Sequence, residues 1–187
     1  MKLETERLYI VPCTEESMQV ANEQGFNSGP HIVGHVENVK QNQALLPWGA
    51  WYVIRKEDDI VLGDIGFKGK PNEEHTVEIG YGFIEKYWNK GYATEAVREL
   101  ISWAFQTREV ETIIAETLLE NESSIRVLEK LHMKRTGTTE TMINWKIKNT
   151  ARRISGGIFI VMVAFVFDHS DIQLSARQNA WNDCEQQ

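Results

Sequence analysis

The chain has 187 residues, of which 42% are hydrophobic and 25% are charged, and its formal net charge at pH 7 is −7. This length suits one domain better than two, and the composition allows a buried core, which excludes a wholly disordered protein. The negative net charge and the lack of a dense run of Lys and Arg argue against a nucleic-acid partner, because such proteins face phosphates with basic groups.

Cysteine usage and the apolar runs bear on location. The two cysteines, Cys13 and Cys184, lie at opposite ends of the sequence, too few and too far apart for a disulfide framework or a cysteine zinc site. Residues 1–7 lack the apolar core of a signal peptide. The longest apolar run, residues 158–167, is shorter than the roughly 20 residues that a membrane helix needs. We therefore expect a cytoplasmic protein without a membrane span.

The first half of the predicted fold consists of one strand, two helices and three further strands. In chain order these elements are a strand over residues 8–11, helices over residues 14–25 and 31–43, and strands over residues 51–55, 60–67 and 76–84. Thr14 is expected to cap the first helix, because its hydroxyl can accept a hydrogen bond from an otherwise unpaired N–H group. Gly80 and Gly82 stand in the last of these strands, where glycine often marks a bulge or a close approach to the backbone.

The second half begins with the longest predicted helix. That helix starts near Tyr92, and its buried face is predicted from apolar residues at helical spacing: Ala93, Ala96, Val97, Leu100, Ile101, Ala104 and Phe105. The remaining predicted elements are a strand over Thr112–Leu118, a helix from residue 121 or 123 to residue 131, and strands over Lys134–Thr138 and residues 142–147. The order predicts a mixed α/β (α+β) fold, with a central sheet of antiparallel and parallel parts flanked by about four helices.

The connection from the strand over residues 76–84 to the long helix carries the clearest chemical signal. A helix N-terminus offers unpaired N–H groups and a partial positive charge, which favour a phosphate. Gly91 and Ala93 are small where the backbone must approach a ligand, and Lys90 adds a cation. Glu95 in the first helical turn is the acid that the helix dipole favours. The segment is neither a Walker A loop nor a dinucleotide-binding glycine motif. The alternative to a phosphate site is a tight connection between strand and helix that binds no ligand.

Three motifs together resemble the GNAT superfamily of N-acetyltransferases, in particular its branch of ribosomal-protein N-acetyltransferases. The segment Trp88-Asn89-Lys90-Gly91-Tyr92-Ala93 resembles the pyrophosphate motif R/Q-x-x-G-x-G/A. The other two motifs are Thr5-Glu6-Arg7-Leu8 and Asn121-Glu122-Ser123-Ser124 followed by Val127-Leu128-Glu129-Lys130-Leu131. The resemblance covers residues 3–148 in matching order. Trp88 replaces the commoner Arg or Gln, and His132-Met133 replaces the usual Gly-Phe, whose glycine permits a left-handed helix end.

The resemblance implies a GNAT-like N-acyltransferase domain over residues 1–149, followed by an atypical extension over residues 150–187. It implies acetyl-coenzyme A (acetyl-CoA) as the cosubstrate, and the residues themselves predict no metal. Backbone groups near Tyr81 and Phe83 would bind its pantetheine arm and thioester oxygen, and Asn121 would bind the pantetheine or the acceptor. The residues expected to hold the phosphates are Trp88, Asn89, Lys90, Gly91, Tyr92, Ala93 and Thr94.

Acetyl transfer to an amine needs a base, because an aliphatic amine is mostly protonated at neutral pH. Glu78 is the first candidate base, and its alternative role is that of an exposed strand acid. Asn121 and Ser124 are expected beside the reacting atoms, although Asn121 also suits a helix N-cap. Many family members protonate the leaving thiolate with a Tyr that residues 121–131 lack, so Ser124 or water would have to serve.

We therefore expect an N-acetyltransferase that acts by direct attack of a primary amine, carried by a small molecule or a protein N-terminus. The alternative is a non-catalytic acyl-CoA-binding or regulatory module. The apolar run over residues 158–167 could be an added strand, a homodimer contact or a membrane-touching segment. His31 and His35 have the spacing of zinc ligands on a helix, but no third ligand is evident, so they could instead face the acceptor.

Overall fold

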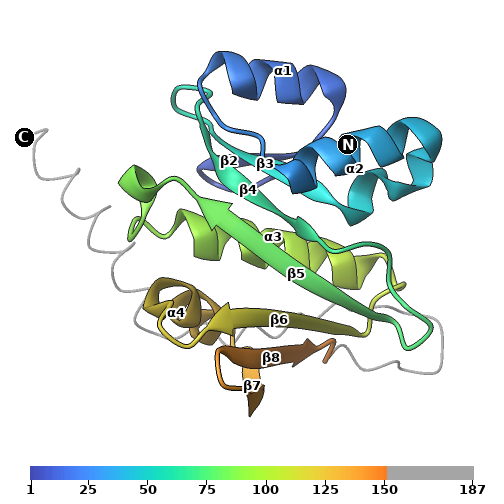
Figure 1. Ribbon diagram of the computed structural model, residues 1–187, viewed down its shortest axis with the longest axis vertical. Helices are drawn as coiled ribbons and strands as arrows, with labels where there is room; N and C mark the ends of the chain where they lie inside the picture. The colour runs from blue at the N-terminus through green and yellow to red at the C-terminus, as the bar shows by residue number, and fades with distance from the viewer. Residues whose placement is uncertain (151–187) are drawn as a thin grey trace, which may run out of the picture. The chain divides into compact units, whose positions relative to one another are not determined.

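Eight strands form one mixed sheet in residues 1–150, the part of the chain that the computed structural model describes (Figure 1). They are β1 (Leu3–Glu4), β2 (Leu8–Pro12), β3 (Ala50–Arg55), β4 (Val61–Phe67), β5 (Thr76–Phe83), β6 (Thr112–Leu118), β7 (Lys134–Thr138) and β8 (Met142–Lys148). Their order in the sheet is β1-β2-β3-β4-β5-β6-β8-β7, and only the pair β5–β6 is parallel. The predicted mixed sheet is confirmed.

Four α-helices accompany the sheet in the described residues, as predicted. They are α1 (Glu15–Glu23), α2 (Pro30–Gln41), α3 (Tyr92–Gln106) and α4 (Glu122–Lys130), and short 3-10 helices cover η1 (Gln43–Trp48) and η2 (Glu85–Tyr87). The predicted cap of α1 is present, because the Thr14 hydroxyl accepts a hydrogen bond of 3.3 Å from the backbone N–H of Ser17. Neither 3-10 helix nor the two-residue strand β1 was predicted.

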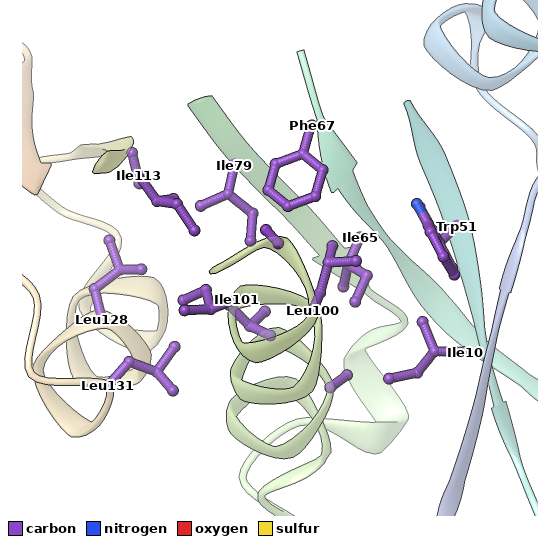
Figure 2. Close-up of a cluster of buried hydrophobic side chains, with 14 of the residues drawn as sticks. Ile10, Trp51, Ile65, Phe67, Ile79, Leu100, Ile101, Ile113, Leu128 and Leu131 are labelled. Atoms are coloured by element: carbon purple, nitrogen blue, oxygen red, sulfur yellow. The ribbon is translucent and has the colours of Figure 1, made fainter. Parts of the chain in front are cut away.

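The two faces of the sheet bury different clusters, and the alternation of side chains along β3 shows why. Trp51 and Val53 point into the larger core, which includes Leu100 and Ile101 of α3 (Figure 2). Neighbouring Tyr52 joins the smaller cluster that contains residues of α1 and α2. Successive residues of a strand face opposite sides, so α3 and α4 cover one face and α1 and α2 cover the other.

The parallel pair β5–β6 is paired over its first three residues only. The register joins Thr76 to Thr112, Val77 to Ile113 and Glu78 to Ile114. Beyond Glu78, β5 continues to pair with β4, whereas β6 continues to pair with β8. The two strands therefore diverge toward their carboxyl ends, as Figure 1 shows, and leave a gap in the sheet.

The end of α4 has the geometry that a glycine usually supplies. His132 has a φ of 57°, which lies in the left-handed region that costs a non-glycine residue free energy. The N–H of His132 donates to the carbonyl of Glu129, and the N–H of Met133 donates to that of Leu128. This pair of bonds is a Schellman ending, so the replacement of Gly-Phe by His132-Met133 leaves the turn intact but strained.

The predicted extension beyond residue 150, including the apolar segment 158–167, lies outside the described residues. Among the described helices, none combines the length and the apolarity that crossing a bilayer requires.

Candidate active site

The gap between β5 and β6 exposes backbone groups that a sheet would otherwise pair. Lys68 N–H donates to the Glu78 carbonyl and Ile84 N–H donates to the Leu62 carbonyl. Residues of an antiparallel ladder point their backbone groups alternately toward and away from the partner. The backbone groups of Tyr81 and Phe83 therefore point away from β4 and toward the gap. The Phe83 carbonyl already accepts a hydrogen bond of 2.7 Å from Trp88 Nε1, so a ligand lying along β5 could bond to the Phe83 N–H and to the backbone of Tyr81.

Tyr81 reaches across the gap with its side chain. Its hydroxyl donates a hydrogen bond of 3.1 Å to the carbonyl of Ser124, in the first turn of α4. Burial raises the pKa of Tyr81 to about 12, although the bond to Ser124 opposes the shift. The phenol is therefore neutral at pH 7 and links the β5 side of the gap to α4.

The N-terminus of α3 lies beside this gap and has no side-chain cap. Gly91 precedes the helix with a φ of 80°, and Asn89 has a φ of 59°. The first backbone bond of the helix runs from the N–H of Glu95 to the carbonyl of Gly91. The N–H groups of Tyr92, Ala93 and Thr94 precede that bond, so together with the helix dipole they form an anion site.

A network of polar contacts holds this end of α3 against the N-terminal segment. The Glu95 carboxylate accepts hydrogen bonds from Thr5 Oγ1 at 2.5 Å and Arg7 Nε at 2.8 Å, and Arg7 Nη1 donates to the carbonyl of Lys90 at 3.1 Å. Burial alone would raise the pKa of Glu95, but the bonds from Thr5 and Arg7 outweigh it and lower that pKa. This explains why Thr5 and Arg7 accompany the Gly91 motif.

A pocket of about 350 Å³, here called the α3–α4 pocket, opens between the two helices at the end of β5. It brings together most of the residues predicted to bind the cofactor: Tyr81, Phe83, Trp88, Asn89, Gly91, Tyr92, Ala93, Thr94 and Asn121. Predicted Ser124 lines it as well. Lys90 is absent from this lining. Its carbonyl accepts a hydrogen bond from Arg7, and its Nζ lies 5.8 Å from the centre of the Tyr87 ring.

Several residues of this pocket were not predicted from the sequence. They are Gly82, Tyr87, Ser123, Arg126, Val127 and Lys130. Arg126 and Lys130 stand four residues apart on α4, so they share one helix face and give the pocket two cations. Arg126 is also ion-paired with Glu122 at 2.5 Å. The spacing of Arg126 and Lys130, downstream of Asn121, was the available signal.

Asn121 caps α4, the alternative role considered for it. Its Oδ1 accepts hydrogen bonds from the N–H of Ser124 at 3.1 Å and from the hydroxyl of Ser123 at 2.8 Å. Within residues 1–150, the Nδ2 amide of Asn121 donates no hydrogen bond to another protein group. Asn121 can therefore cap the helix and still present a donor to the α3–α4 pocket.

Glu78 lies at the point where β5 and β6 separate, opposite Ile114. Its carboxylate forms an ion pair with Lys68, and its side chain is 24% exposed. Glu78 is absent from the linings of both pockets described here for residues 1–150. It shares a sheet face with Gly80 and Gly82, because residues two apart on a strand face the same side.

A second pocket of about 690 Å³, here called the α2 pocket, lies between α2 and the sheet and also reaches Trp48, Ile65 and Phe67 of the larger core. It is built by α2, η1, β4 and β5, and it shares Tyr81 and Gly82 with the α3–α4 pocket. His31 and His35 both line it, but no group of three potential metal ligands occurs in the described residues. Ligands in the two pockets would thus meet at Tyr81 and Gly82.

Comparison with known proteins agrees with this architecture. The family model described as an acetyltransferase (GNAT) domain matches residues 7–134, and the chain belongs to that family. The uncharacterized N-acetyltransferase YjdG of Bacillus subtilis (strain 168) is 33% identical over 95 residues, which are 51% of this chain and 56% of YjdG. The chain spans about half the length of this relative and of two others, YnaD of the same organism and p20 of Bacillus licheniformis.

Solved structures share the fold over most of the chain. A GNAT-family acetyltransferase from Bacillus anthracis is 28% identical, with a TM-score of 0.62 over 79% of this chain and 98% of that one. The ribosomal L7/L12 alpha-N-protein acetyltransferase RimL, solved in complex with coenzyme A, has a TM-score of 0.67 over 79% of this chain and 98% of its own, at 11% identity. At that identity the likeness is one of fold.

Proposed function

We propose that this protein transfers the acetyl group of acetyl-CoA to a primary amine. The observation that carries the proposal is the junction of the β5–β6 gap with the uncapped N-terminus of α3. A strand-like arm could lie along Tyr81 and Phe83 while its phosphates bind the first N–H groups of α3. Gly91 fits this use, because its φ of 80° turns the chain so that those N–H groups open into the α3–α4 pocket.

The residues of the chain bind and orient the two substrates and move protons, while acetyl-CoA supplies the reactive thioester. Glu78, which lines neither pocket, takes one proton from the acceptor ammonium through water. The freed amine forms the new C–N bond as the C–S bond breaks. Backbone N–H groups at the gap stabilise the negative charge that develops on the thioester oxygen. The sulfur leaves with the electron pair of the broken bond, and the second amine proton reaches it through Ser124 or water. The products are an N-acetyl amine and coenzyme A, with one proton released.

Two measurements test the proposal together. Isothermal titration with acetyl-CoA measures binding, and release of free thiol in the presence of primary amines measures turnover. Glu78→Gln and Ser124→Ala should lower turnover without weakening acetyl-CoA binding. Glu116→Gln, an exposed position on β6 outside both pockets, is the matched control and should leave turnover unchanged.

The outcomes separate the two functions considered. Wild-type turnover in both Glu78→Gln and Ser124→Ala would remove these residues from the mechanism. Binding of acetyl-CoA without turnover on any amine would instead favour the non-catalytic acyl-CoA-binding module.

The acceptor type is left open between a small-molecule amine and a protein N-terminus. RimL is named for a ribosomal protein N-terminus, but its likeness to this chain concerns the fold alone, and fold does not select a substrate. The cytoplasmic location, the possible homodimer and the division of the chain at residue 149 stay predictions.

A further inference from the structure

Asp64 is a largely buried carboxylate on the sheet face that α1 and α2 cover. Its side chain is 17% exposed, and its Oδ2 lies 2.9 Å from Nε2 of His31. Burial raises the pKa of Asp64, and the contact with His31 offsets this only in part. Because the His31 side chain is 61% exposed, the pair by itself contributes little to stability. A buried carboxylate with so weak a partner is suited to a cationic ligand.

The second oxygen of Asp64, Oδ1, faces the backbone of β5 at Gly82, which has no side chain. Asp64 is paired with Gly82 in the register of β4 and β5, and a Cβ atom added to Gly82 would lie 3.8 Å from Asp64 Oδ1. A Cβ atom added to Gly80 would meet nothing within 4 Å. Gly82 therefore keeps space open beside the carboxylate, and Gly80 leaves further space two residues along the strand. Gly82 is also where the α2 pocket meets the α3–α4 pocket.

The α2 pocket combines this carboxylate with apolar walls. Leu45 lines it, and so do Trp48 and Phe67, whose rings lie 5.6 Å apart at the border of the larger core and are each 5% exposed. His35 lines it too, and within residues 1–150 its buried Nε2 has no hydrogen-bond partner. Burial lowers the pKa of His35, so this imidazole is neutral and does not compete for Asp64. An unsatisfied buried nitrogen is unfavourable, so a bound ligand that pairs with it would be stabilised.

Lys68 is the cation nearest to Asp64 in the sequence of the pocket lining, and it has a different partner. Lys68 lines the α2 pocket from the end of β4, but its ammonium is paired with Glu78. Asp64 is thus the carboxylate of this pocket that remains for an incoming ammonium group.

We propose that Asp64 binds the acceptor in its ammonium form, with the apolar part of the acceptor against Leu45, Trp48 and Phe67. The acceptor class is then a primary amine that is protonated in water and carries an apolar group close to its nitrogen. This inference rests on the proposed acetyltransferase function and assigns the α2 pocket to the second substrate. His31 is the positioning residue that holds the carboxylate.

The test compares two probes that differ in charge but hardly in shape, 2-phenylethylamine and 2-phenylethanol. Binding of each is measured by isothermal titration at saturating coenzyme A, in the wild-type protein, in Asp64→Asn and in Asp58→Asn. Asp58 is the matched control, because its carboxylate is paired with Arg55 outside both pockets. We expect the wild type and Asp58→Asn to prefer the amine by about tenfold, the ratio that one charge-assisted hydrogen bond gives, and Asp64→Asn to show no preference.

Gly82→Ala is a second variant that does not alter charge. Its methyl group would stand in ordinary contact with Asp64 Oδ1, so the fold should tolerate it while the ammonium group is kept from the carboxylate. Gly82→Ala should reduce the preference for the amine. It tests the role of Asp64 if Asp64→Asn does not fold. An equal preference in Asp64→Asn and wild type, or no preference in the wild type, would overturn the inference. Failure of the wild type to bind coenzyme A in the same titrations would instead refute the proposed function.

Discussion

Gly91→Ala should weaken coenzyme A binding far more than it destabilises the protein. At a φ of 80° an L-residue costs roughly 1–2 kcal/mol, and the added Cβ would lie 3.4 Å from Arg7 Nη2. Relief of that strain would rotate the first N–H groups of α3 away from the pocket. Loss of one charge-assisted bond to a phosphate is worth roughly 1.5–3 kcal/mol, which is roughly a 10- to 100-fold rise in Kd.

Gly25→Ala supplies the matched control. Gly25 follows α1 with a φ of 77°, and an added Cβ would meet nothing within 4 Å. Both variants should lower the thermal midpoint by about 2–8 °C, the shift for roughly 1–2 kcal/mol in a chain of this size. Only Gly91→Ala should change the affinity for coenzyme A in isothermal titration. If both variants lose stability equally and Gly91→Ala binds coenzyme A within about twofold of wild type, a factor worth less than one weak hydrogen bond, the N-terminus of α3 is not the phosphate site.

Three further predictions concern the end of α4, the Glu95 network and the cations of the α3–α4 pocket. His132→Gly should stabilise the protein by about 1 kcal/mol in urea unfolding, because it removes the left-handed strain at that position. Glu95→Gln should destabilise it by about 1–2 kcal/mol at pH 7 through the lost charged bonds. Since the pKa of Glu95 is lowered from 4.5, this difference should persist above that pH and vanish as the pH falls through the folded-state value. Exchanging Arg126 and Lys130 for Gln should weaken coenzyme A binding at low salt and less so at 1 M salt, because ions screen exposed charges.

Each of these three predictions has an outcome that would contradict it. Lower stability of His132→Gly would mean that the imidazole makes a contact worth more than the strain. A stability difference for Glu95→Gln that stays constant down to pH 3 would show that the carboxylate charge does not matter. Equal salt dependence of coenzyme A binding in the wild type and the double variant would place the phosphates away from α4.

The sequence was sufficient for the elements whose signal is local. The apolar spacing of α3 follows from its contact with one sheet face, so periodicity predicted the helix and its start at Tyr92. The strand β7 was predicted with the bounds that it has. In contrast, β1 exists because Leu3 and Glu4 pair with Ile10 and Tyr9, and a pattern of two residues is too short to predict partners in another strand.

Most residues of the α3–α4 pocket, the proposed coenzyme A site, were also predictable, because backbone N–H groups and small residues form much of its lining. The motif around Gly91 fixes a turn and a helix start, and both are properties of neighbouring residues. The structure placed Glu78 beside Lys68 and turned the carbonyl of Lys90 to Arg7. Those partners come from other strands and from the N-terminal segment, so spacing along the chain could not reveal them.

By itself, the sequence determined the class of fold and the uncapped start of α3 that forms the proposed anion site, since periodicity, glycine and helix capping act over a few residues. Tertiary structure alone decided that β5 and β6 part after Glu78 and Ile114. It also set Asp64 opposite Gly82, on the face that His31 reaches from α2. The gap and the α2 pocket arise from pairing and packing between distant segments, because a strand's neighbours, rather than its own residues, determine which backbone groups and which carboxylate remain for a ligand.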